Sequence, residues 1–128
     1  SQFYSDRKYS LKNRVNLPNS IFLQVPFSKV GLTEKQALAE GFEIKVKEIP
    51  AAAVPKLQLE FKTAGLLRAI VDSKTNKILG AALFCHNSPE VINIIKTAID
   101  AGLDYTVLRD QIFTHPTVAE SLNDLFNL

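Results

Sequence analysis

The segment 114–120 holds the residues of this sequence best suited to proton transfer. Histidine titrates near neutral pH, so the imidazole of His115 can act as a general acid or base. Such a histidine needs a carboxylate on its other ring nitrogen, which sets the tautomer and stabilises the imidazolium. Glu120 lies about one helical turn beyond Thr117, so its carboxylate can fold back toward His115. Pro116 also makes a cis peptide bond after His115 possible. The spacing therefore predicts a candidate His115–Glu120 acid/base pair.

A structural interpretation of Glu120 competes with this chemical one. The run Thr117-Val118-Ala119-Glu120 matches a capping box, in which the first and fourth residues bond reciprocally at the start of a helix. His115 would then be an ordinary loop residue that precedes a helix. Spacing alone leaves both interpretations open and favours the structural one.

Cys85 and His86 form a second candidate site, because a thiolate and an imidazole suit a soft metal such as copper. Adjacent residues on a strand point to opposite faces, however, and two ligands are too few to hold a metal tightly. We therefore expect a structural thiol at the end of a strand and no metal site. The alternative function is a small metal-binding or sensory module that uses Cys85, His86 and His115.

The elements around these candidates have clear sequence signals. Two apolar runs, 65–72 and 78–85, are joined by five polar residues and predict a β-hairpin. Because apolar residues occupy consecutive positions, we expect both strands to be central and covered on both faces. Ser88 as N-cap and Pro89 as first helical residue begin a helix that ends near Gly102. Its apolar residues recur at helical spacing: Val91, Ile94, Ile95, Ala98 and Ile99.

Two shorter helices are predicted further along, from Asp104 to Asp110 and over 117–126. The apolar stripes of helices 89–101 and 117–126 could supply a subunit interface.

The first half of the chain predicts mainly strands. The β-branched and aromatic run 21–25 predicts a short strand that Pro26 ends. Thr33 and Gln36 form a capping box for a helix that stops at Gly41. The run 42–49 alternates apolar and charged residues, as expected of a strand with one exposed face, and 50–55 reads as an irregular crossing. Strands followed by helices predict an α+β domain, with helices on one face of a largely antiparallel sheet.

Composition limits the function classes. The 128 residues, 46% hydrophobic and 22% charged, fit one globular domain. A single cysteine excludes an internal disulfide framework and a four-cysteine zinc site. The five glycines are isolated from one another, so no glycine-rich loop can cradle a phosphate. The sequence contains no methionine, and we therefore expect a piece of a longer translation product.

The net charge of +2 is unevenly distributed. Residues 1–18 carry four basic residues and one acidic residue, and the remainder has a net charge of −1. No basic face for nucleic acid is expected once this leader is subtracted. The leader has no continuous apolar core, as a signal peptide would, and no apolar run is long enough to span a membrane. We interpret residues 1–19 as a solvated connector.

Three stretches in this order resemble the C-terminal interface, or dimerisation, domain of the flavoprotein disulfide reductase family. They are 30–37, 70–81, and His115-Pro116-Thr117 with Glu120. The resemblance runs from about Ser20 to the C-terminus. Within the family, 92–95, 108–116 and 121–126, together with Cys85, look closest to a bacterial, cytosolic subgroup of reactive-chlorine-resistance flavoproteins with copper(II) reductase activity.

The resemblance implies a domain at 20–128 that builds a two-fold homodimer, preceded at 1–19 by a connector from an FAD-binding domain. The His-Pro segment of such a domain reaches the flavin and redox-active cysteine pair of the partner subunit. His115 would be the acid/base for that dithiol, Glu120 its orienting carboxylate, and His115-Pro116 a cis peptide beside the FAD. The family's nucleotide motifs and its Cys-x4-Cys pair are absent from this sequence. FAD and NAD(P)H are therefore expected in a parent enzyme, with no cofactor and no activity in this chain alone.

Overall fold

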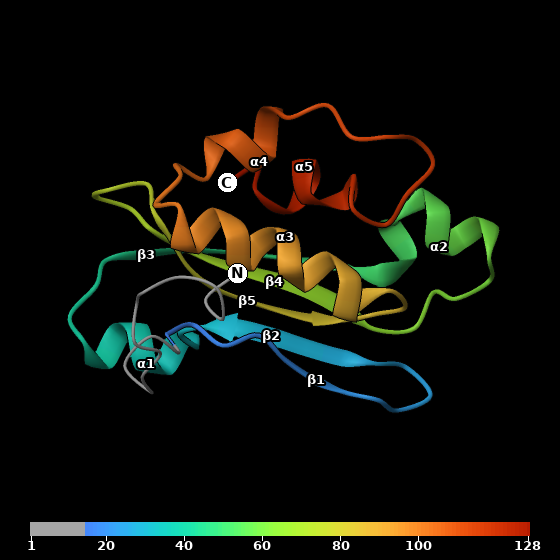
Figure 1. The fold of residues 1–128 in the computed structure, drawn as a ribbon, viewed down its shortest axis with the longest axis horizontal. Coiled ribbons are helices and arrows are strands. Elements are labelled where there is room, and N and C mark those ends of the chain that lie inside the picture. The colour runs from blue at the N-terminus through green and yellow to red at the C-terminus, as the bar shows by residue number, and fades with distance from the viewer. Residues whose placement is uncertain (1–14) are drawn as a thin grey trace, which may run out of the picture.

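The computed structural model describes residues 15–128, and its centre is a five-stranded sheet with the order β1-β2-β5-β4-β3. Every neighbouring pair of strands is antiparallel. The strands are β1 (Asn19–Ile21), β2 (Phe27–Gly31), β3 (Ile44–Pro50), β4 (Leu66–Asp72) and β5 (Ile78–Phe84). The predicted α+β class, the hairpin and its central position in the sheet are confirmed (Figure 1).

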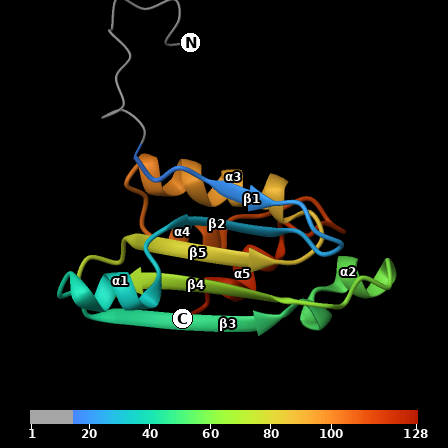
Figure 2. The same ribbon diagram turned by 90° about the horizontal axis from the view of Figure 1, so that it is seen from below.

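Three helices cover one face of this sheet: α3 (Ser88–Asp100), α4 (Thr106–Asp110) and α5 (Ser121–Leu125) (Figures 1 and 2). The short helix α1 (Glu34–Ala39) lies against the opposite face, where Arg68 of β4 forms an ion pair with Glu34 at 3.1 Å. A 3-10 turn, η2 (Ala51–Ala53), and the helix α2 (Pro55–Leu59) lie at one end of the sheet. These two elements occupy the predicted irregular crossing and the stretch after it, which the sequence pattern left unassigned.

The hydrophobic core lies between the sheet and helices α3–α5. Alternate residues of β4 and β5 face these helices, and Leu67, Ala69, Val71 and Leu83 are completely buried. The opposite face is only partly covered, because Leu66 keeps 38% of its surface exposed and Arg68 remains half-buried. The expectation that both faces of the central strands are covered is therefore met on one face only.

The apolar stripes of α3 and α5 pack into this same core. Ile95, Leu122, Leu125 and Phe126 are completely buried, and Ala98 is nearly so. These side chains are occupied within the chain, so the expectation that the stripes form a subunit interface is wrong.

The predicted strand at 21–25 is also wrong. Only Ile21 belongs to β1, and the following residues form the connection to β2, with Phe22 80% and Leu23 61% exposed. The strand that the pattern missed is β2, because its buried position Ser28 is polar. The Ser28 hydroxyl is fully buried and bonds the hydroxyls of Ser20 at 2.7 Å and Ser88 at 2.9 Å. A hydrogen-bonded serine is thus buried where the pattern looked for an apolar residue.

Helix starts were predicted with mixed success. The capping box of α1 is present, with reciprocal bonds between Thr33 and Gln36. Ser88 does not cap α3: Asn87 holds that position, and the Ser88 hydroxyl is used in the sheet contact above and in a bond to the Pro26 carbonyl. The predicted helix over 117–126 begins only at Ser121. The leader charges lie in residues 1–14, outside the described residues.

Candidate functional site

The loop between α4 and α5 carries the candidate pair, and the structure brings its two members together. His115 Nδ1 lies 2.8 Å from one carboxylate oxygen of Glu120 and 2.9 Å from the other. An ionised carboxylate only accepts hydrogen bonds, so Nδ1 carries the proton and donates it. This tautomer leaves Nε2 as the nitrogen that can exchange a proton. The His115 side chain is 70% exposed and that of Glu120 only 20%, so the ring faces outward from a sheltered carboxylate.

Glu120 also completes the capping contact that the sequence allowed. Its Oε2 accepts from the Thr117 amide at 2.9 Å, and its own amide donates to Thr117 Oγ1 at 3.3 Å. The chemical and structural interpretations of Glu120 are therefore compatible, because one carboxylate orients the histidine and closes the turn before α5. The His115–Pro116 peptide bond is cis, as the resemblance implied.

The local hydrogen bonds favour the charged form of Glu120. The His115 ring donor is the largest influence that lowers the pKa of this carboxyl, and the Thr117 amide is the next. Partial burial opposes them but does not reverse the direction. At neutral pH Glu120 is an anion, as an orienting partner for an imidazolium must be.

Two further side chains shape this loop. Thr117 Oγ1 donates to the Thr114 carbonyl at 2.7 Å, which closes a tight turn around His115 and Pro116. Asn123 of α5 donates its side-chain amide to backbone carbonyls at the end of α4. Sequence reasoning missed both roles, because neither a hydroxyl in a turn nor an asparagine within a helix has a spacing that predicts its backbone partner.

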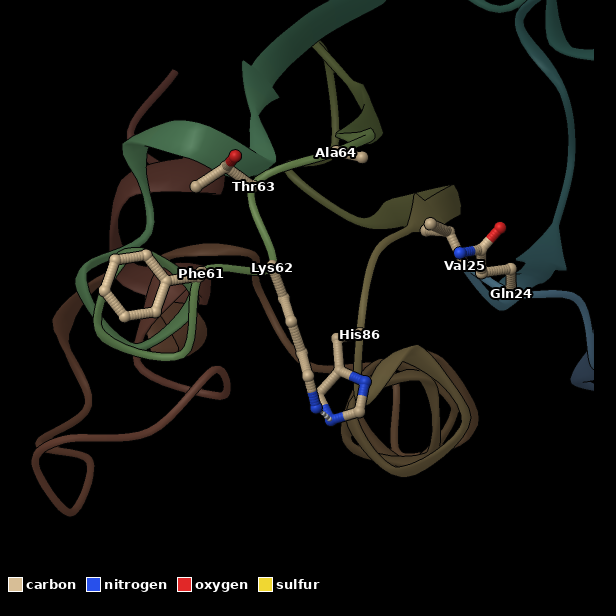
Figure 3. Close-up of a pocket in the computed structure, with 7 residues that line it drawn as sticks. All are labelled: Gln24, Val25, Phe61, Lys62, Thr63, Ala64 and His86. Atoms are coloured by element: carbon tan, nitrogen blue, oxygen red, sulfur yellow. Dashed lines mark hydrogen bonds between the residues drawn. The ribbon is translucent and has the colours of Figure 1, made fainter.

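The second candidate pair is split by the fold. Cys85 is completely buried in the core, and burial raises the pKa of its thiol to about 11. His86 instead lines an open pocket of about 570 Å³ at the end of the sheet (Figure 3). Figure 3 shows the Lys62 side chain reaching toward His86, with Lys62 Nζ 3.1 Å from His86 Nε2. A lysine ammonium only donates, so His86 Nε2 is the acceptor.

This arrangement does not favour the metal-binding alternative. The Cys85 thiol is buried and protonated, and the His86 Nε2 already accepts from Lys62 Nζ. Among residues 15–128, no group of three or more His, Cys, Asp or Glu side chains is placed to hold a metal ion.

Comparison with known proteins identifies the family. Residues 17–126 match the model of the pyridine nucleotide-disulphide oxidoreductase dimerisation domain, and the chain belongs to this family. The antiparallel sheet, the three helices that cover it and the exposed His-Pro loop all lie within the region that matches this domain model.

Individual relatives show the same relationship. The chain is 50% identical over 127 residues to Escherichia coli RclA, described as a probable pyridine nucleotide-disulfide oxidoreductase. The aligned region covers 99% of this chain and 29% of that protein. It is 36% identical over 115 residues to a Bacillus cereus mercuric reductase, and this aligned region covers 88% of the chain and 18% of the reductase. The chain therefore spans less than a third of the length of these relatives.

Solved structures agree. The structure of RclA, described as an HOCl-induced flavoprotein disulfide reductase, superposes with a TM-score of 0.94 over 99% of this chain and 29% of its own. LpdA from Mycobacterium tuberculosis superposes with a TM-score of 0.80 at 14% identity, over 87% of this chain and 24% of its own, and supports the fold alone. Within residues 15–128, no helix has the length and apolar character needed to cross a membrane.

Proposed function

We propose that this chain is the interface domain of a homodimeric FAD- and NAD(P)H-dependent oxidoreductase of the disulfide reductase type. Its part in catalysis is to lend the His115–Glu120 pair to the flavin and dithiol site of the partner subunit. The observation that carries this proposal is a histidine whose Nδ1 is held by a carboxylate at 2.8 Å while most of the ring is exposed. A ring held in this way on the surface is accessible to a reaction centre outside its own chain.

The residues present fit this division of labour. The isolated glycines supply no phosphate-binding loop, so other domains would hold the FAD. His115 and Pro116 are both exposed and are the residues that would lie beside it. Bound FAD supplies two-electron transfer between NAD(P)H and the dithiol.

The chemistry proposed for this chain is a reversible proton transfer. His115 Nε2 accepts the proton of one thiol of the partner subunit, which leaves a thiolate and an imidazolium. Glu120 stabilises that imidazolium through Nδ1–H, and the proton returns when the thiolate is protonated again. General acid–base catalysis of this kind contributes about 10²–10⁴-fold to a rate.

The test is His115→Gln in the full-length enzyme, with His86→Gln as the matched control. We expect the dithiol–flavin step to slow by about 10²-fold or more in His115→Gln, with dimerisation retained in sedimentation experiments. His86→Gln removes a histidine outside the loop and should leave the rate unchanged. An unchanged rate in His115→Gln would remove this residue from the mechanism.

The terminal acceptor is a finer part of the proposal. RclA is 50% identical to this chain, and one of its structures is described as a Cu(II) complex. We therefore propose Cu(II) as an acceptor of the parent enzyme, in a cytoplasmic response to reactive chlorine. The mercuric reductases among the relatives make Hg(II) the natural comparison. NAD(P)H oxidation by the full-length enzyme with each ion separates the two, and turnover of Hg(II) alone would contradict the copper assignment.

A further inference from the structure

Asn123 makes an unusual set of contacts for one side chain. Its Nδ2 lies 2.9 Å from the Leu108 carbonyl, 3.0 Å from that of Arg109 and 2.8 Å from that of Gln111. All three partners are acceptors, so the amide nitrogen and not its oxygen faces them. Two amide hydrogens serve three carbonyls, and at least one hydrogen is shared.

These carbonyls lie at the C-terminal end of α4, where a helix leaves backbone acceptors without intrahelical partners. Asn123 satisfies them from α5 and so joins the two helices that flank the His115 loop. Each helix is itself anchored in the core, α4 by Leu108 at 2% exposure and α5 by Leu122 at 0%. The Asn123 amide adds a direct link between these anchored helices and holds the backbone at Gln111, where the loop begins, against α5.

The first part of the loop, up to Pro116, has little burial to hold its shape, whereas Val118 beyond it is 3% exposed and packs in the core. Ile112 is 95% exposed and the His115 side chain 70% exposed, and Phe113 packs only partly against the core. The conformation of this part of the loop depends on two hydrogen bonds within the segment that Asn123 closes. These are the Thr117 hydroxyl on the Thr114 carbonyl and the Glu120 carboxylate on His115.

We propose that Asn123 is a positioning residue for the His115–Glu120 pair. It acts through the backbone at Gln111 and through the first turn of α5, which follows Glu120 directly. Loss of its amide removes this direct link and makes the loop between the two anchored helices more mobile, so the carboxylate and the imidazole spend less time in contact. The catalytic meaning of this role rests on the proposed function, but the role itself does not.

The pair geometry can be read without flavin, because the His115 bond lowers the pKa of the Glu120 carboxyl. The experiment is a carbon-13 NMR titration of Glu120 in the 128-residue chain, as wild type and as Asn123→Ala. We expect the Glu120 pKa of Asn123→Ala to move up toward its ordinary value of 4.5. An unchanged Glu120 pKa in the folded variant would overturn the proposal.

The matched control is Asn93→Ala, which removes a single side-chain bond to the Pro89 carbonyl on α3, outside the loop. Its Glu120 titration should equal that of the wild type, and a shift as large as that of Asn123→Ala would overturn the proposal. If Asn123→Ala does not fold, Asn123→Ser retains one donor and is titrated instead, with the same two outcomes.

A separate arm measures the dithiol–flavin step of the full-length enzyme carrying Asn123→Ala. A slower step with unchanged KM for NAD(P)H supports both the positioning role and the proposed function. A shifted Glu120 pKa with an unchanged rate supports the positioning role and counts against His115 as the acid/base.

Discussion

Phe61 occupies a backbone conformation that suits glycine. It follows the C-cap of α2 with φ +56°, in the left-handed region. Its amide donates to the Gln58 carbonyl at 3.1 Å and the Lys62 amide to the Leu57 carbonyl at 2.9 Å. This pair of bonds defines a Schellman motif, whose left-handed position is usually glycine. Phe61 is 93% exposed, so burial of its ring does not offset the strain of the left-handed backbone conformation.

Phe61→Gly should therefore stabilise the chain. Relief of the left-handed conformation is worth about 1–2 kcal/mol. The greater freedom of glycine in the unfolded chain opposes this by about 0.4–1 kcal/mol. Little buried apolar surface is lost, so the net gain is about 0.5–1 kcal/mol, or roughly 3 °C in Tm for a chain of this size.

The assay is urea and thermal unfolding of the wild type, Phe61→Gly and Phe61→Ala, followed by circular dichroism. Phe61→Ala keeps the strained backbone and should change the free energy of unfolding by less than about 0.5 kcal/mol. Gly102→Ala is the reverse control: Gly102 ends α3 at φ +63° with open space around its Cβ position, and alanine there should cost about 1 kcal/mol. The reasoning is refuted if Phe61→Gly is no more stable than wild type, or if Phe61→Ala gains as much.

Three other outcomes follow from the structure. Because the folded-state pKa of Glu120 lies below its ordinary 4.5, its bonds stabilise the fold above that pH and are lost as pH falls through the folded pKa. The stability difference between wild type and Glu120→Gln in urea should thus shrink on acidification below about pH 4.5, and a constant difference would contradict this. Gly80→Ala places a Cβ 2.0 Å from the Leu32 carbonyl oxygen and should cost more than about 2 kcal/mol in urea unfolding, well above Gly41→Ala, whose Cβ position is open. The Cys85 thiol, buried and with a pKa of about 11, should react with a disulfide reagent at pH 7.5 at least about 100-fold more slowly in the native chain than in urea, and comparable rates would show that the strand end opens freely.

Local sequence signals predicted those elements whose residues interact with near neighbours. The hairpin of β4 and β5 is confirmed because consecutive apolar residues joined by a polar tip have few alternative pairings. The capping box at Thr33 is confirmed because both partners lie within one helical turn. Failures occurred where a distant partner decided the outcome, as for the buried Ser28 and for Ser88, whose hydroxyls meet from positions 60 residues apart.

The candidate site divides in the same way. The spacing of His115, Pro116 and Glu120 was enough by itself to define a candidate acid/base pair, because a carboxylate five residues on can return to the histidine through one turn of chain. From the isolated glycines, which form no phosphate loop, the sequence also predicts that nucleotide binding lies outside this chain, and this stays a prediction. Only the tertiary structure decided that Glu120 serves the histidine and the turn together, and that Cys85 and His86 part between core and surface. It alone showed Asn123 joining α4 to α5, because a hydrogen bond from a side chain to remote backbone carbonyls leaves no pattern in the order of residues.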